Sequence, residues 1–180
     1  VSSFEEYEKV TVKRYSEDLA KLNAPRCLLN KEWLNSRGTI IRSDRKAVEI
    51  RILDEQECIK SDVALSCFIR STLRGMLAGE EFACLPHSVL VENLGNVMRD
   101  GLRAMVRHPE SKIARQVCRL MFEIASEYAT SEERRYLCIV LERIENGNLS
   151  NLILRDVAKK AQKTELKEAI FHVYSSLADC

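Results

Sequence analysis

The sequence predicts an α+β protein that is mostly helical, with one antiparallel β-hairpin packed on a C-terminal helical bundle. Residues 47–54 alternate between apolar and polar side chains, as a strand with one buried face does. From residue 61 onward, apolar residues recur every three or four positions with short polar connections, which is typical of amphipathic helices in a bundle. The 180 residues, 46% hydrophobic and 31% charged, are enough to bury a core.

Charge and cysteine content exclude several classes of protein. The net charge of +1 gives no overall field that would attract nucleic acid or an acidic membrane, so we predict binding to neither. We find no membrane-length apolar run and no leader, and expect a cytoplasmic protein. The seven cysteines contain no Cys-x-x-Cys pair, which favours reduced thiols over a zinc site. Because the chain starts with Val1, we expect a piece of a longer polypeptide.

The first elements are a helix and a break. Apolar side chains at helical spacing predict a helix over residues 4–22, capped by Ser2 or Ser3. The proline in residues 23–26 ends it. Residues 28–34 then read as a short helix or turn that packs Trp33 into the core.

The hairpin follows at residues 39–54, with strands at 39–42 and 47–54 joined by a polar turn. Side chains two apart on a strand share a face, so Val48, Ile50 and Ile52 are expected to point into a core. Glu49 and Arg51 then share the opposite face. A carboxylate can bind a divalent cation and a guanidinium can hold phosphate oxygens, so this face is a candidate site for metal–phosphate chemistry. The alternative is a solvated sheet face with a cross-strand ion pair.

Two stretches of this region resemble a known family. Asn35-Ser-Arg-Gly38 and Ala47-Val-Glu-Ile-Arg-Ile-Leu-Asp-Glu-Gln-Glu-Cys58 are similar to the C-terminal signature of carboxylate–amine ligases of the glutamate-cysteine ligase type, which are relatives of glutamine synthetase. The resemblance is dense over residues 27–75. It departs where Ile41-Arg42-Ser43-Asp44-Arg45 replaces the family's Arg-Phe-Asp-Arg turn after a proline.

The resemblance implies a fold and residue roles. The hairpin would join a larger glutamine synthetase-like antiparallel sheet in the intact enzyme. Glu49 would bind Mg²⁺ and Arg51 would be the catalytic contact to the transferred phosphoryl group of ATP. Three further arginines would hold phosphate or the substrate carboxylate: Arg37, Arg42 and Arg45.

The remaining chain is predicted to be helical. A helix over residues 61–77, with Ser61 as its cap, would pack on the apolar face of the hairpin, and its Arg70 and Arg74 could reach an anion. A second helix over residues 88–105 would turn Leu94 and Val97 inward, although its glycines weaken the pattern. Further helices are expected at 111–128, 131–145, 149–161 and 164–178, with Thr130 and Glu133 capping the second of these.

The sequence therefore predicts two regions and one main function. Residues 1–80 would be the C-terminal part of a ligase catalytic domain, and residues 81–180 a helical extension. The function would be that of an ATP-dependent carboxylate–amine ligase, incomplete in this chain, that joins a small carboxylate such as glutamate to an amine. The alternative is a noncatalytic helical module that binds a protein partner. An exposed hairpin edge could also pair with a second copy in a homo-oligomer.

Overall fold

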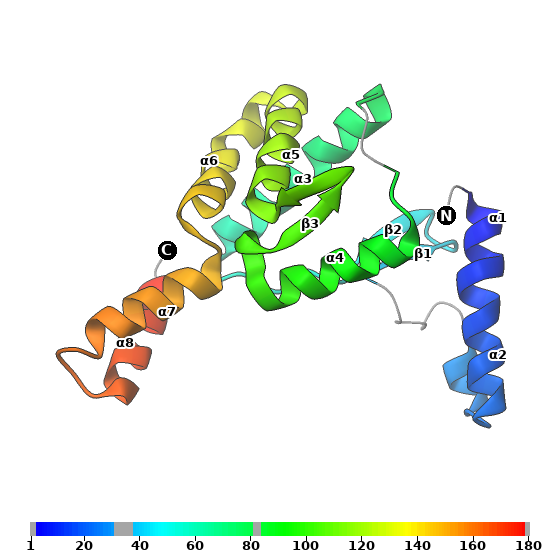
Figure 1. Ribbon diagram of the computed structural model, residues 1–180, viewed down its shortest axis with the longest axis horizontal. Helices are drawn as coiled ribbons and strands as arrows, with labels where there is room; N and C mark the ends of the chain where they lie inside the picture. Colours follow the sequence, from blue (N-terminus) through cyan, green and yellow to red (C-terminus); the bar gives the residue numbers. More distant parts are fainter. Residues whose placement is uncertain (1–2, 31–37, 81–83, 179–180) are drawn as a thin grey trace. The chain divides into compact units, whose positions relative to one another are not determined.

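The computed structural model describes residues 3–30, 38–80 and 84–178. They form a mostly helical α+β structure with two small antiparallel strand pairs, which confirms the predicted fold class (Figure 1). Contacts divide the chain into two units, residues 1–54 and 55–180. The predicted functional division after residue 80 stays a prediction.

The first unit begins with the predicted helix. It consists of α1 (Phe4–Tyr7), a π-helical stretch over Glu8–Lys13 and α2 (Arg14–Lys21). Ser3 caps it, because its hydroxyl accepts a hydrogen bond of 3.1 Å from the Glu6 amide. A short 3₁₀ helix follows at Arg26–Leu29. The predictions for Trp33 and Arg37 lie outside the described residues.

The hairpin of this unit pairs β1 (Thr39–Arg42) with β2 (Ala47–Ile50), as predicted, although the second strand is shorter than expected. The prediction that its apolar face is buried is wrong for two of the three side chains: Val48 is 64% exposed and Ile52 58% exposed. The strand ends at Ile50 and the chain bends at Ile52, so the alternation stops before that residue. Ile40, which is 2% exposed, is buried instead, on the face of Glu49.

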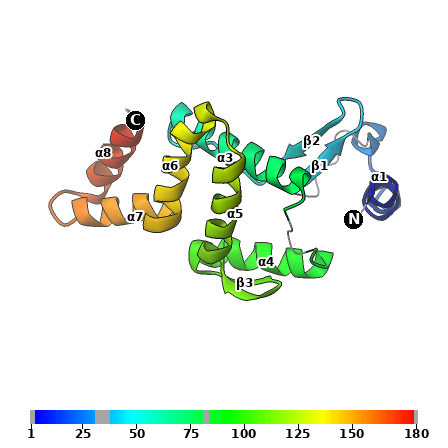
Figure 2. The same cartoon turned by 90° about the horizontal axis from the view of Figure 1, so that it is seen from above.

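The core of the second unit is built from three helices, α3 (Ile59–Ala78), α5 (Ala114–Tyr128) and α6 (Ser131–Asn146). They lie side by side in both views (Figures 1 and 2). Small and apolar side chains from α3 and α6 meet in the buried clusters, which include Ala64, Cys67, Leu137, Val140 and Ile144. The predicted helix over residues 61–77 is therefore confirmed as α3, and its packing on the hairpin stays a prediction.

The start of α3 differs from the prediction. The helix begins at Ile59, so Ser61 lies in its first turn and is not the cap. Ser61 instead donates a hydrogen bond of 2.7 Å to Glu57, whose carboxylate is also ion-paired with Arg143 of α6. The Asp62 carboxylate accepts the Gln56 amide at 3.0 Å. Cys58 at the N-cap position makes no side-chain cap hydrogen bond, and these two contacts instead tie the first turn of α3 to the segment before it.

The predicted helix over residues 88–105 is wrong at its C-terminal end. α4 (His87–Asp100) stops before Gly101, whose φ of 58° suits glycine, and a 3₁₀ turn over Gly101–Arg103 follows. The strands β3 (Met105–His108) and β4 (Glu110–Ile113) then form a second hairpin. The Asn93 side chain of α4 exchanges two hydrogen bonds with the Arg107 backbone of β3, at 2.9 and 3.0 Å.

Burial in α4 also departs from the prediction. Leu94 and Val97 are each 39% exposed, and no residue of this helix is buried. Within the unit, the main contact of α4 is with the β3 strand. The side chains of Leu94 and Val97, which were expected to face inward, therefore stay partly exposed to solvent.

The chain then continues into the two predicted helices, α7 (Leu149–Lys160) and α8 (Leu166–Ala178), which pack on each other. Gly147, at φ 113°, ends α6, and the Asn148 side chain caps α7. No helix in the described part of the chain is both long and apolar enough to cross a membrane.

Candidate functional site

The β1–β2 hairpin gathers three of the predicted site residues on one face. In the antiparallel register Ile40 is opposite Glu49 and Arg42 is opposite Ala47, so Arg42 and Glu49 point to the same side. Arg51 follows two residues after Glu49, and its amide donates a hydrogen bond of 2.7 Å to the Gly38 carbonyl. This bond continues the pairing of the strands and holds the Arg51 backbone beside them.

The two arginines hold Glu49 from both sides. Arg42 donates its Nε–H to Glu49 Oε2 at 2.6 Å, and Arg51 donates its Nε–H to Glu49 Oε1 at 2.7 Å. The Glu49 side chain is 40% exposed, whereas the arginine side chains are 14% and 25% exposed. The hydrogen bonds from Arg42 and then Arg51 lower the pKa of Glu49, and partial burial opposes them. Glu49 is therefore a carboxylate at neutral pH that solvent can reach.

This arrangement can bind charge of either sign. Each Glu49 oxygen accepts one hydrogen bond from an arginine and has a second lone pair available to a metal ion. A guanidinium has four N–H groups besides Nε–H, so an arginine that holds Glu49 through Nε can also contact phosphate oxygens.

A Mg²⁺ ion usually takes one or two protein carboxylates, with water and substrate phosphates completing its coordination. Among the described residues, no group of three or more His, Cys, Asp or Glu could hold a metal by itself. A Mg²⁺ ion that is bound together with a nucleotide needs only one or two protein carboxylates, and the ionised, partly exposed Glu49 can supply one.

Arg45, another predicted site residue, lies apart from the triad that Arg42, Glu49 and Arg51 form. It belongs to the turn, its side chain is 79% exposed, and it forms an ion pair of 3.8 Å with Asp44. The turn is closed by Lys46 in a left-handed conformation, at φ 49°. The structure thus brings Arg42 to Glu49 but does not bring Arg45 there.

Gly38, the last residue of the Asn-Ser-Arg-Gly stretch, is closely covered by Ile52. A Cβ at Gly38 would lie 2.4 Å from Ile52 Cγ2, closer than two carbons can approach. Glycine at this position therefore lets the chain after β2 fold back over the end of β1. This contact leaves no room for a side chain at position 38, directly before β1, the strand that carries Arg42.

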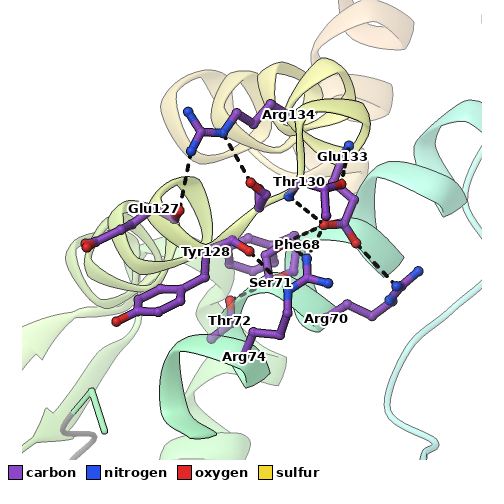
Figure 3. Close-up of polar contacts among 11 residues, drawn as sticks. Phe68, Arg70, Ser71, Thr72, Arg74, Glu127, Tyr128, Thr130, Glu133 and Arg134 are labelled. Atoms are coloured by element: carbon purple, nitrogen blue, oxygen red, sulfur yellow. Dashed lines mark hydrogen bonds and ion pairs between the residues drawn. The ribbon is translucent and has the colours of Figure 1, made fainter. Parts of the chain in front are cut away.

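A second carboxylate held by arginines lies in the helical unit, and sequence reasoning assigned it only a capping role. Arg74 of α3 is ion-paired with Glu133 Oε2, and Arg70 lies 3.6 Å from Oε1 (Figure 3). The anion that these two arginines reach is thus a side chain of α6. The Glu133 carboxylate also accepts the Thr130 amide at 3.0 Å, which confirms the predicted capping box.

Glu133 is buried, with a side chain that is 8% exposed. The backbone hydrogen bond from Thr130, together with Arg74, lowers the pKa of Glu133 to about 2 although burial raises it. Arg74 also donates to the Tyr128 carbonyl at 3.0 Å, and Arg134 donates to the Ala129 carbonyl at 3.2 Å (Figure 3). These bonds satisfy carbonyls at the end of α5, so the Glu133 cluster joins α3, α5 and α6.

Comparison with known proteins adds a family to this geometry. The sequence model of glutamate-cysteine ligase family 2 matches residues 3–175. An uncharacterized protein of Archaeoglobus fulgidus is 40% identical over 180 residues, which are 100% of this chain and 43% of that protein. The chain therefore spans less than half the length of this relative. No solved structure matches the chain.

Proposed function

The chain belongs to glutamate-cysteine ligase family 2, and on that premise we propose that it supplies the Glu-x-Arg hairpin of an ATP-dependent carboxylate–amine ligase. The observation that carries the proposal is the Glu49 carboxylate held between Arg42 and Arg51. One face of the hairpin thus presents an ionised oxygen ligand and two guanidinium groups. A reaction between a nucleoside triphosphate and a carboxylate requires such groups.

The proposed reaction has two steps. An oxygen of the substrate carboxylate attacks the γ-phosphorus of ATP, so that an acyl phosphate forms and ADP leaves. The amine nitrogen then attacks the acyl carbon, phosphate leaves with the electrons of the broken C–O bond, and the amine loses a proton. The carboxylate substrate is glutamate or a similar small acid, and the reaction belongs to the cytoplasm, where ATP is available.

Each residue of the triad has a distinct role in this proposal. Glu49 contributes one oxygen ligand to Mg²⁺, which screens the phosphate charges when it is bound. Arg51 contacts the phosphoryl group that is transferred, where negative charge must be neutralised. Arg42 holds the other oxygen of Glu49, fixes its orientation and adds positive charge, while Arg37 and Arg45 are proposed as further contacts to phosphate or substrate.

The test uses the whole protein that carries this chain. We expect ADP release only when both glutamate and an amine such as cysteine are present with Mg²⁺ and ATP. Glu49→Ala should weaken Mg²⁺-dependent nucleotide binding by about tenfold or more, since a metal ligand is lost. Asp44→Ala is the matched control, because Asp44 is an exposed carboxylate in the turn of the same hairpin. Equal binding by the wild type and Glu49→Ala would refute the assignment.

A noncatalytic helical module is the second candidate function, and the exposed apolar side chains of α4 and α8 favour it. Val91 and Met98 are 53% and 80% exposed on α4, and Phe171 is 68% exposed on α8. In that case the hairpin triad would only stabilise its strands. Two results together would favour this function: nucleotide binding that is unchanged in Glu49→Ala, and no amine-dependent ADP release.

A further inference from the structure

We propose that the cavity between α7 and α8 is a binding site for a phosphate group, separate from the hairpin. The two helices pack on each other (Figure 2). A cavity that is lined by both has a volume of about 490 Å³. Lys159 and Lys160 line it from the end of α7, and Lys163 lines it from the turn that follows. This volume lies within the range of small-molecule sites.

The second helix contributes polar groups to the same cavity. His172 and Ser176 are one helical turn apart on α8, so they share a face, and both line the cavity together with the buried Val173. Hydroxyl and imidazole groups can donate hydrogen bonds to phosphate oxygens. Hydrogen-bond donors from α7, from the turn after it and from α8 thus line the same cavity.

The charges of the cavity are positive and largely uncompensated. Among the described residues, the three lysine side chains have no ion-pair or hydrogen-bond partner. The one carboxylate of the lining, Asp156, accepts a hydrogen bond of 2.9 Å from Arg155. A multiply charged oxyanion would neutralise several of these ammonium groups at once, and lysine is a common phosphate ligand.

The α7 carbonyls explain only part of this cluster. Cations are favourable near the C-terminal end of a helix, which accounts for Lys159 and Lys160 without any ligand. It does not account for Lys163, which follows the helix, nor for His172 and Ser176, which belong to α8. The convergence on a cavity therefore points to a bound anion and not to helix stabilisation alone.

The experiment measures binding of inorganic phosphate and of Mg²⁺-free ADP to the full chain by calorimetry at low salt. We expect at least one of the two to bind, and Lys160→Glu to weaken that binding about tenfold or more, since one attraction becomes a repulsion. Lys167→Glu is the matched control, because Lys167 is an exposed lysine of α8 outside the cavity lining. It should change the affinity less than about twofold, by screened long-range charge alone.

Two results would overturn the proposal. One is the absence of binding of either probe up to about 10 mM, a concentration at which even a weak specific site would be detected. The other is binding that Lys160→Glu and Lys167→Glu change equally or not at all, which would indicate non-specific charge attraction or binding elsewhere in the chain. Binding of ADP alone would assign the site to a phosphate ester, and binding of both probes to phosphate in general. Since the readout is the change in binding caused by variants of α7 and α8, it is independent of ligase activity at the hairpin.

Discussion

Glu49 of the hairpin and Glu133 of the helical unit are each held by two arginines, but their surroundings differ. The Glu49 side chain is 40% exposed and its partners lie on two short strands. The Glu133 side chain is 8% exposed, and its partners join three helices. Similar ionic groups therefore have different effects: the buried cluster holds helices together, and the exposed one keeps an ionised carboxylate open to solvent.

The largest effect on stability is expected from Glu133→Ala. Its removal leaves Arg74 with one fewer partner and the Thr130 amide without its carboxylate, so the free energy of unfolding should fall by about 3 kcal/mol. Urea denaturation of the full chain measures this, with the exposed neighbour Glu132→Ala as control. Glu49→Ala should change the unfolding midpoint far less. If the Glu49 and Glu133 variants lose equal stability, the contrast between the two clusters is wrong.

Arg51→Lys should have the largest effect on activity. Lysine keeps the charge but cannot hold Glu49 and a phosphate with one planar group, so we expect turnover to fall about a hundredfold, or about 2.7 kcal/mol. The measurement is amine-dependent ADP release by the whole protein. Arg14→Lys, an exposed change on α2, is the control and should leave turnover unaltered. Near-normal turnover in Arg51→Lys would reject the phosphate role.

Gly75→Ala tests how tightly the helices near the Glu133 cluster are packed. A Cβ at Gly75 of α3 would lie 2.3 Å from Ile124 Cγ2 and 3.1 Å from Tyr128 Cδ2, both on α5. We expect the free energy of unfolding to fall by about 2 kcal/mol. Among the described residues, no atom beyond the neighbouring backbone of α4 lies within 4 Å of such a Cβ at Gly95, so Gly95→Ala should instead add about 0.5–1 kcal/mol. Thermal denaturation of both variants checks the opposite signs.

The smallest expected effect is the pH dependence of the Glu133 cluster. The pKa of Glu133 is lowered to about 2 from an ordinary value of 4.5, so the unfolded state binds the proton first as the pH falls. The stabilisation is complete above about pH 5 and is lost between about pH 5 and pH 2. Between pH 7 and pH 4 this residue should account for about 1 kcal/mol of lost stability. Glu133→Gln should flatten that part of the profile, and an unchanged profile would contradict the assignment.

Local patterns in the sequence were enough for most of the fold and for bringing Glu49 and Arg51 together on the hairpin. The alternation at residues 47–50 predicts β2, and it also places Glu49 and Arg51 on one face. The spacing of Thr130 and Glu133 predicts the start of α6. These signals work because hydrogen bonds within a turn, a cap or a strand pair join residues only a few positions apart.

Tertiary structure decided the features that depend on distant residues. The β3 strand forms beside Asn93 and Asn96, whose amides bond its backbone from α4, so helical periodicity failed there. Arg74 finds its anion 59 residues away, at Glu133. Which of two similar carboxylates is buried was likewise set by the packing of α3, α5 and α6. Burial depends on the elements that cover a residue, and a local sequence pattern does not contain them.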